Sequence, residues 1–235
     1  ILTQFYRIWR KYSYPATFEA GGRDSTSQSL LGLIGLGMPG TDKHIATPIS
    51  RFLALLGIMR LPARTEEGIQ ALVRLLAPRT RTTVTPHCPR TFFINNPLGF
   101  YGNDDFLLDG YNVLGDETTE VSSQLLIALY TDDIAEAQGW LPEGQIYQDF
   151  LDLLRVYLGW RYKARIQLTV PARLLPAPVL GETPFMLGMT GILGVEGEEI
   201  PPDIPATFTT EPGGYCGMPS ATLQQGNQRV AYHFD

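Results

Sequence analysis

Two stretches of the chain share one pattern, in which an amphipathic helix is followed by a short turn and a strand of alternating residues. The first is "RTEEGIQALVRLLAP" with "RTRTTVTP" after it, over residues 64–86, and Thr65 is the predicted helix cap. The second is "YQDFLDLLRVYLGWRYKARIQLTVP", over residues 147–171, where Gly159 ends the predicted helix. The two stretches match in pattern rather than in identity. They indicate a duplicated helix–turn–strand unit, which requires a fold that mixes helices with strands.

Shorter elements are predicted around these units. A helix is predicted over residues 2–14, ended by Pro15, and a second over residues 46–57, with Thr47 as its cap and Gly57 at its end. A further strand, "VSSQLLIALYT", is predicted over residues 121–131 after a long loop-like segment.

These patterns predict an α+β fold with short helices, small β-sheets or hairpins and long extended connections, elongated rather than built on a single compact core. After residue 194 the chain is rich in Pro, Gly, Thr and Gln, which predicts an extended arm that is ordered only where a partner holds it. The predicted division is a helical region over 1–60, the first helix–turn–strand unit over 61–100, a linker with a strand over 101–144, the second unit over 145–194, and the C-terminal tail over 195–235.

The stretch "LIGLGMPG" contains the spacing G-x-G-x-x-G at Gly35, Gly37 and Gly40. A dinucleotide site needs a strand before these glycines, a helix that opens among them, and an acid about 20 residues further on. Here the preceding "SLLGLI" is at least as helical as strand-like, Pro39 stands where the helix would begin, and the later segment "ALLGIMRLP" has no acid. The glycines therefore predict a helix end and a tight turn.

No group of residues in the sequence selects an active site. The three histidines are His44, His87 and His233, and His87 beside Cys88 favours a surface or capping role, because neighbours in an extended segment point to opposite sides. No His-Glu-x-x-His or Cys-x-x-Cys spacing occurs, and the acidic pairs stand in polar turns. We predict no catalytic residue, no cofactor and no metal.

The composition points to a chain that other proteins cover. Charged residues make up 18% of the sequence, against about 25% in typical globular domains. The net charge of -6 and the pI of about 5.1 argue against a general nucleic-acid footprint and against a polybasic membrane protein. The longest apolar run, from Leu30 to Met38, is too short to span a bilayer. Two unpaired cysteines suit a reducing compartment, and the opening "ILTQFYRIWRKY" suggests that a further N-terminal portion precedes it.

Candidate protein interfaces come from aromatic residues at helical spacing and from local basic clusters. The aromatic stripe of the first helix can face either the core of the protein or a partner subunit, and both interpretations are open. The candidate interface residues are Phe5, Tyr6, Trp9 and Tyr12 on that helix, Arg79 and Arg81 in the first helix–turn–strand unit, and Trp160, Arg161 and Tyr162 in the second.

The order of these segments resembles the TssG family of the bacterial type VI secretion system. The helix "FYRIWRKY" is similar to the family's F-Y-R-x-W-x-K-Y segment, and "ISRFLALLGIMRLPARTEEGIQALVRLLAP" resembles its R-S-x-E-G-L-x-x-L-L block through Arg64, Glu67, Gly68, Leu72 and Leu75. "LLGLIGLGMPG", "YNVLGDETTEVSSQLLIAL" and "LGMTGILG" resemble further blocks in the same order, although Met189 and Ile192 replace two tryptophans of the closing one. The resemblance covers residues 1 to about 194.

The resemblance implies a structural subunit of the baseplate wedge rather than an enzyme. A TssG protein joins two copies of TssF and two trimers of TssK, and it works with further baseplate and hub components such as TssE and VgrG. It would be cytoplasmic, in a baseplate docked at the inner-membrane complex, with no direct membrane insertion and no nucleic-acid partner. Two alternatives remain open: a cytoplasmic nucleotide-binding enzyme whose site the sequence does not reveal, and a baseplate protein of a related phage-like tail.

Overall fold

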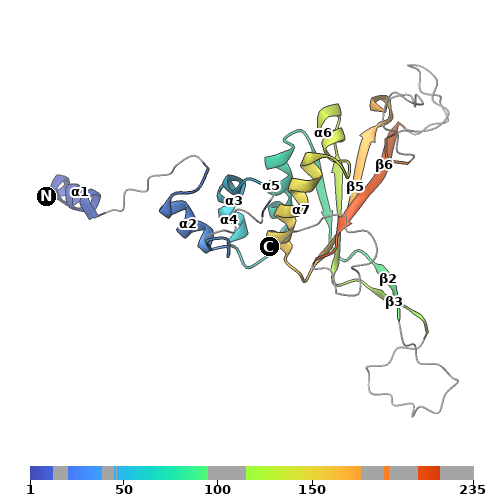
Figure 1. The fold of residues 1–235 in the computed structure, drawn as a ribbon, viewed down its shortest axis with the longest axis horizontal. Coiled ribbons are helices and arrows are strands. Elements are labelled where there is room, and N and C mark those ends of the chain that lie inside the picture. Colours follow the sequence, from blue (N-terminus) through green and yellow to red (C-terminus); the bar gives the residue numbers. More distant parts are fainter. Residues whose placement is uncertain are drawn as a thin grey trace, which may run out of the picture. The chain divides into compact units, whose positions relative to one another are not determined.

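The structure is a computed structural model, and it describes residues 1–12, 21–38, 45, 47–94, 115–175, 188–190 and 206–217. The described residues fall into two compact units, one up to Arg64 and one from Thr65 onward (Figure 1). The predicted α+β class, with short helices and small sheets, is confirmed. Among the described residues, no helix is long and apolar enough to cross a membrane.

The first unit is helical throughout its described part. It contains α1 (Leu2–Tyr12), α2 (Ser25–Gly32), α3 (Ile49–Ala54) and α4 (Leu56–Met59). Asp24 caps α2, because its carboxylate accepts the backbone N–H of Ser27 at 2.9 Å. The buried apolar side chains of this unit are Leu31, Phe52, Leu55 and Met59.

The glycine motif is the end of a helix, as predicted. Gly35 has a φ of +83° and donates its N–H to Gly32, and the next residue, Leu36, donates to Leu31. This pair of bonds is the Schellman arrangement, which satisfies the last carbonyls of α2. Gly37 packs so closely that an added Cβ would lie 2.7 Å from the Gly32 backbone. The segment before the motif is thus a helix rather than the strand that a dinucleotide site requires. Gly40 lies outside the described residues.

The helix predicted over residues 46–57 is wrong in its details. Thr47 does not cap it, because its hydroxyl accepts a hydrogen bond from the Arg51 guanidinium at 2.7 Å, and Pro48 stands before the first helical residue. Gly57 does not end it either, since it lies inside α4. The break comes at Leu55, whose φ of -98° and ψ of 5° separate α3 from α4.

The second unit is a four-stranded mixed sheet covered on one face by two helices (Figure 1). The strand order is β1-β4-β5-β6, in which β4 and β5 are parallel and the other two pairs are antiparallel. The parallel pair is possible because helices connect β4 to β5. The elements are α5 (Glu66–Leu76), β1 (Arg81–Thr85), β4 (Gln124–Tyr130), α6 (Ile134–Gly139), α7 (Gln145–Leu158), β5 (Lys163–Pro171), a 3-10 turn (Ala172–Leu174) and β6 (Thr207–Tyr215).

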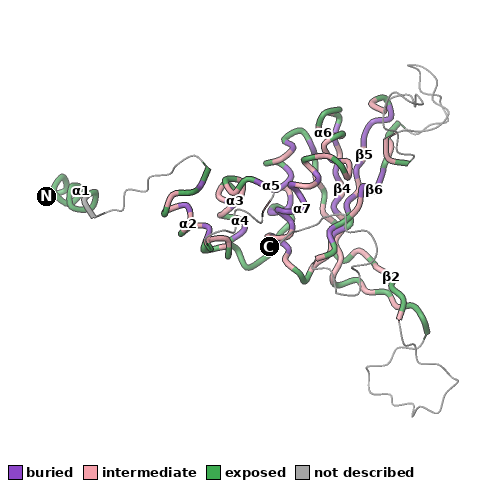
Figure 2. Tube along the Cα trace, in the orientation of Figure 1, coloured by how far each residue is buried: buried purple, intermediate pink, exposed green. Residues whose placement is uncertain are grey.

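Both predicted helix–turn–strand units are present, as α5 with β1 and as α7 with β5. Thr65 caps α5 by accepting the N–H of Gly68, and its own backbone N–H and carbonyl both bond to the Tyr157 hydroxyl of α7. The buried faces of the helices and the sheet are purple in Figure 2 and form one core. Its members are Ile69, Leu72 and Val73 of α5, Phe150, Leu153 and Leu154 of α7, and Ile127, Leu129, Ile166 and Leu168 of the sheet.

The prediction of a tail held only by a partner is wrong for Thr207–Tyr215. These residues form β6, which pairs with β5 of the same chain and buries Tyr215. A β-bulge opposite Gln167 interrupts the pairing, and Pro212, Gly213 and Gly214 stand close to it. These residues are rare in strands, and they concealed β6 in the sequence.

A separate two-stranded antiparallel ribbon was also not predicted. It pairs β2 (Arg90–Phe93) with β3 (Glu117–Glu120) and lies beyond one end of the larger sheet (Figure 1).

Candidate protein-protein interfaces

The aromatic stripe of α1 is exposed in the isolated chain. Every residue from Ile1 to Arg10 is exposed, and Phe5, Tyr6 and Trp9 show 72%, 59% and 64% of their surface. The rings of Tyr6 and Trp9 lie 6.3 Å apart between centroids. The Tyr12 side chain lies outside the described residues. An exposed aromatic face is what docking on a partner requires.

The first corner, the turn from Ala77 to Arg81 between α5 and β1, is tied to α6. Glu136 accepts the backbone N–H of Arg79 at 3.0 Å and the hydroxyl of Thr80 at 2.7 Å. The Arg79 guanidinium pairs with Asp133, and the indole N–H of the fully buried Trp140 donates to the Thr80 oxygen at 3.0 Å. We call this network the Glu136 clasp. Arg79, a candidate interface residue, therefore already has an intramolecular role.

Acid is expected to weaken the Glu136 clasp. Hydrogen bonds from the Glu136 N–H and from Arg79 lower the pKa of the Asp133 carboxyl below its ordinary value of 3.8. Because the folded pKa is lowered, the stabilisation is present above the unfolded value and is lost as pH falls through the folded value. We expect the melting temperature to fall less steeply below about pH 4 in Asp133→Asn than in the wild type. The measurement is thermal unfolding from pH 7 to pH 3.

The matched control for this prediction is Asp132→Asn, which changes the exposed neighbouring carboxylate and should keep the wild-type slope. Equal slopes for Asp133→Asn and the wild type would contradict the role assigned to Asp133.

The second corner, from Gly159 to Lys163 between α7 and β5, exposes its aromatic residue. Trp160 is 77% exposed, and the Arg161 guanidinium lies 5.7 Å from the centroid of the Tyr162 ring. Gly159 has a φ of +65°, and its carbonyl accepts the hydroxyl of Tyr215 at 2.6 Å. Burial raises the pKa of the Tyr215 phenol. The sequence alone does not reveal Tyr215 as a support, because the contact depends on the pairing of β6.

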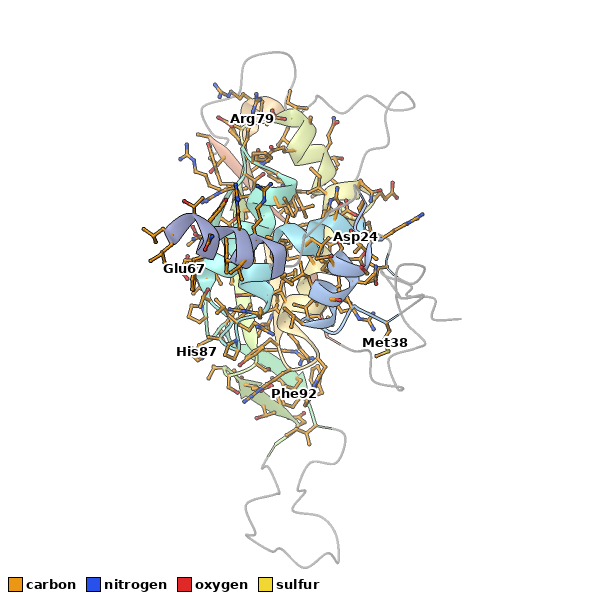
Figure 3. All side chains as sticks on the ribbon, turned by 90° about the vertical axis from the view of Figure 1, so that its left-hand side faces the viewer. Asp24, Met38, Glu67, Arg79, His87 and Phe92 are labelled. Atoms are coloured by element: carbon orange, nitrogen blue, oxygen red, sulfur yellow. The ribbon has the colours of Figure 1, made fainter. Side chains whose placement is uncertain are left out.

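The two corners lie at opposite ends of the sheet. Arg81 pairs with Tyr130 at one end of β4, and Lys163 pairs with Gln124 at its other end, six positions away. At about 3.3 Å for each residue, this places the corners about 20 Å apart. Figure 3 shows Arg79 at one end of the second unit and His87 with Phe92 towards the other. The candidate residues therefore form separate surfaces rather than one site.

Two exposed aromatic residues of the ribbon are not among the candidates predicted from the sequence. Phe92 and Phe93 of β2 are 37% and 74% exposed, and the Arg90 guanidinium lies 5.7 Å from the centroid of the Phe92 ring. The signal available in the sequence was the short run "RTFF" between Pro89 and Asn95, which is typical of a strand.

The described residues do not bring together a group of side chains that resembles an active site. Within those ranges, no group of three or more His, Cys, Asp or Glu residues is placed to hold a metal ion. His87 is exposed in a turn with a φ of +59°, and Cys88 and Cys216 are free thiols.

Comparison with known proteins identifies the family. A family model described as "Type VI secretion, TssG" matches residues 1–194. The chain belongs to the TssG family. No curated protein matches it.

Two solved structures are similar to this TssG chain. One is a chain of the type VI secretion system TssK-TssF-TssG baseplate subcomplex determined by cryo-electron microscopy, with 44% identity and a TM-score of 0.75. That match covers 100% of the present chain and 95% of the other. The second is from the baseplate complex of the type VI secretion system, with 43% identity and a TM-score of 0.61, and the match covers 100% of this chain and 65% of that one.

Family membership confirms the resemblance predicted from "FYRIWRKY" and the blocks that follow it. It also confirms the prediction of a structural protein rather than an enzyme, because the family belongs to the secretion apparatus. Strand β6 lies beyond residue 194, the last residue that the family model matches, but the match to the chain of the TssK-TssF-TssG subcomplex covers the whole chain and therefore includes it.

Proposed function

We propose that this TssG chain is a scaffold subunit of a type VI secretion baseplate and that it joins TssF to TssK. The observation that carries this proposal is the 44% identity, over the whole chain, to a protein solved in complex with TssK and TssF. The proposal includes two copies of TssF and two TssK trimers for each TssG chain, further contacts with components such as TssE and VgrG, and a cytoplasmic baseplate docked at the inner-membrane complex.

Separate exposed surfaces support a scaffold role. The aromatic stripe of α1 belongs to the first unit, and the two corners stand about 20 Å apart on the second. One TssG chain that holds two TssK trimers needs two attachment points, and the two helix–turn–strand units are our candidates for them. Because α5–β1 and α7–β5 share one core, deleting either unit would unfold both, so tests must use surface substitutions.

Co-purification tests the bridging role. TssF with an affinity tag is expressed with untagged TssK, with or without this chain. We expect TssK to be recovered on TssF only when the chain is present. Recovery of the same amount of TssK without the chain would contradict the proposal.

The stripe of α1 is expected to contribute to that assembly. Buried aromatic anchors commonly contribute about 2 kcal/mol or more each to binding, or about thirtyfold in affinity. We expect the double variant Phe5→Ala with Trp9→Ala to weaken binding to TssF or TssK by at least that factor. The matched control is Arg7→Ala on the opposite side of the helix, which should bind like the wild type. If the double variant binds both partners with the affinity of the wild type, α1 is not part of either interface.

A further inference from the structure

We propose that the second corner is a preformed anchor whose Trp160 inserts into an apolar pocket, rimmed by carboxylates, on a partner protein of the baseplate. The Trp160 anchor consists of Trp160, Arg161, Tyr162 and Lys163. The inference rests on the proposed function and adds to it how the second corner docks and what chemistry the partner surface presents.

The first observation is the residue types and their exposure. Trp, Tyr and Arg are the residues that contribute most often to binding hot spots, and here all three are consecutive in one turn. Trp160 leaves 77% of its surface in solvent, the highest exposed fraction among the large hydrophobic side chains in the described part of the second unit. Burial of an indole in that position makes the free energy of binding more favourable, because the side chain has a large apolar area and loses few rotamers.

The second observation is that the backbone around Trp160 is held from three elements. The Gly159 N–H donates to Arg155 of α7 at 3.0 Å, and the Gly159 carbonyl accepts the Tyr215 hydroxyl of β6. The Lys163 N–H donates to Ser123 beside β4 at 2.8 Å. These bonds fix the turn before any partner arrives, so docking costs less conformational entropy than the ordering of a loose loop.

Close backbone packing adds to this support. Gly217, just after β6, lies so near the Trp160 carbonyl that an added Cβ would stand 2.8 Å from its oxygen. The end of β6 thus contacts the turn twice, through the hydroxyl of Tyr215 and through the backbone of Gly217.

The third observation is the local charge. The chain as a whole carries -6, yet from Leu153 to Gly181 the sequence has five basic residues and no acidic one; of the five, Arg165 is paired with Glu211 of β6. Arg161 is exposed beside Trp160, and Lys163 begins the next strand. A pocket edged by Asp and Glu complements this corner, while the net charge of the rest of the chain disfavours other orientations of an acidic partner.

The first corner differs in the exposure of its side chains. Its backbone and its Arg79 side chain bond to Glu136 and Asp133 within the chain, and the nearby Trp140 at the end of α6 is fully buried. The equivalent turn of the first helix–turn–strand unit thus holds the fold together, whereas the turn of the second unit projects its aromatic residue outward.

A protein fits this anchor better than a polyanion. Proteins that bind DNA through phosphates commonly make about 6–10 such contacts, while this corner offers only Arg161 and Lys163 on a chain of net charge -6. A single exposed indole followed by two cations matches one pocket on a folded partner.

The test measures dissociation constants of the purified full chain for TssF and for TssK from the same organism. We expect Trp160→Ala to raise the dissociation constant for one of them at least tenfold. We expect Arg161→Glu with Lys163→Glu to raise it at least fivefold and to reduce its dependence on salt. Tyr215→Phe, which keeps Trp160 and loosens the turn, should give a smaller increase for the same partner.

The matched control is Ile134→Ala, which removes a 52% exposed apolar side chain elsewhere in the unit and should bind within twofold of the wild type. Melting temperatures near that of the wild type show that the variants are folded. If the wild type binds and Trp160→Ala has the same dissociation constants, the proposed anchor is wrong, while the proposed function is unaffected. Failure of the wild type to bind either protein would overturn both. The proposal would also be contradicted if the chain bound neither protein but bound anionic lipid vesicles or a DNA duplex, and if that binding required Trp160.

Discussion

Trp140→Ala is expected to lower the free energy of unfolding of the second unit by about 3–5 kcal/mol, the range for removing a large buried aromatic side chain. Trp140 is fully buried, packs edge-on against Phe150 with ring centroids 5.2 Å apart, and donates its indole N–H to Thr80. The alanine variant leaves a cavity beneath α6 and leaves the Thr80 end of the Glu136 clasp without its indole donor. Urea unfolding followed by far-ultraviolet circular dichroism measures the effect.

Two variants separate packing from hydrogen bonding at this position. Trp140→Phe keeps much of the apolar volume and removes the indole N–H, and we expect it to cost less than Trp140→Ala. Trp160→Ala removes the same side chain from an exposed position and should change the free energy of unfolding by less than about 0.5 kcal/mol. Equal losses for Trp140→Ala and Trp160→Ala would contradict the burial assigned to Trp140.

A chain that ends at Ala206 is expected to lose the cooperative unfolding transition of the second unit. The truncation removes β6, which is the antiparallel partner of β5, and with it the buried Tyr215 and the hydrogen bond from Tyr215 to Gly159. The loss of Tyr215 alone is comparable to other large core truncations, about 3–5 kcal/mol, and domains of this kind have only about 5–15 kcal/mol in total. The exposed edge of β5 would also favour aggregation.

The control for this truncation is a chain that ends at Gly217, which keeps β6 complete. We expect it to show a cooperative transition in the same urea experiment. If the two truncated chains unfold alike, and both cooperatively, β6 is not part of the core.

The elements with strong local patterns could be predicted from the sequence. The helices α5 and α7 have wide apolar faces, Thr65 is a good cap, and Gly159 takes the positive φ that ends α7. Strands β1, β4 and β5 follow from alternation and β-branched residues. The fold class follows from these five elements.

Contacts between distant parts of the sequence could not be predicted. Glu136 contacts Arg79 across 57 positions, so no local pattern indicates that this candidate interface residue is bonded within the chain. The glycines and proline of β6 give a poor local strand signal, and only its pairing with β5 makes it a strand. Trp160 could be named as a candidate interface residue from its position in the turn after α7. The contacts of Tyr215 and Gly217 with that turn could not be predicted, because they depend on the pairing of β6 with β5.

The most direct measurement of the scaffold role is the mass of the intact assembly formed when this chain is co-expressed with its TssF and TssK. Native mass spectrometry counts the subunits without any assumption about their interfaces. We predict one complex that holds a single copy of this chain, two TssF chains and two TssK trimers, and that does not form when the chain is omitted. A complex of two TssF chains and two TssK trimers that forms without the chain, or a chain that is recovered only by itself, would contradict its role as the subunit that joins them.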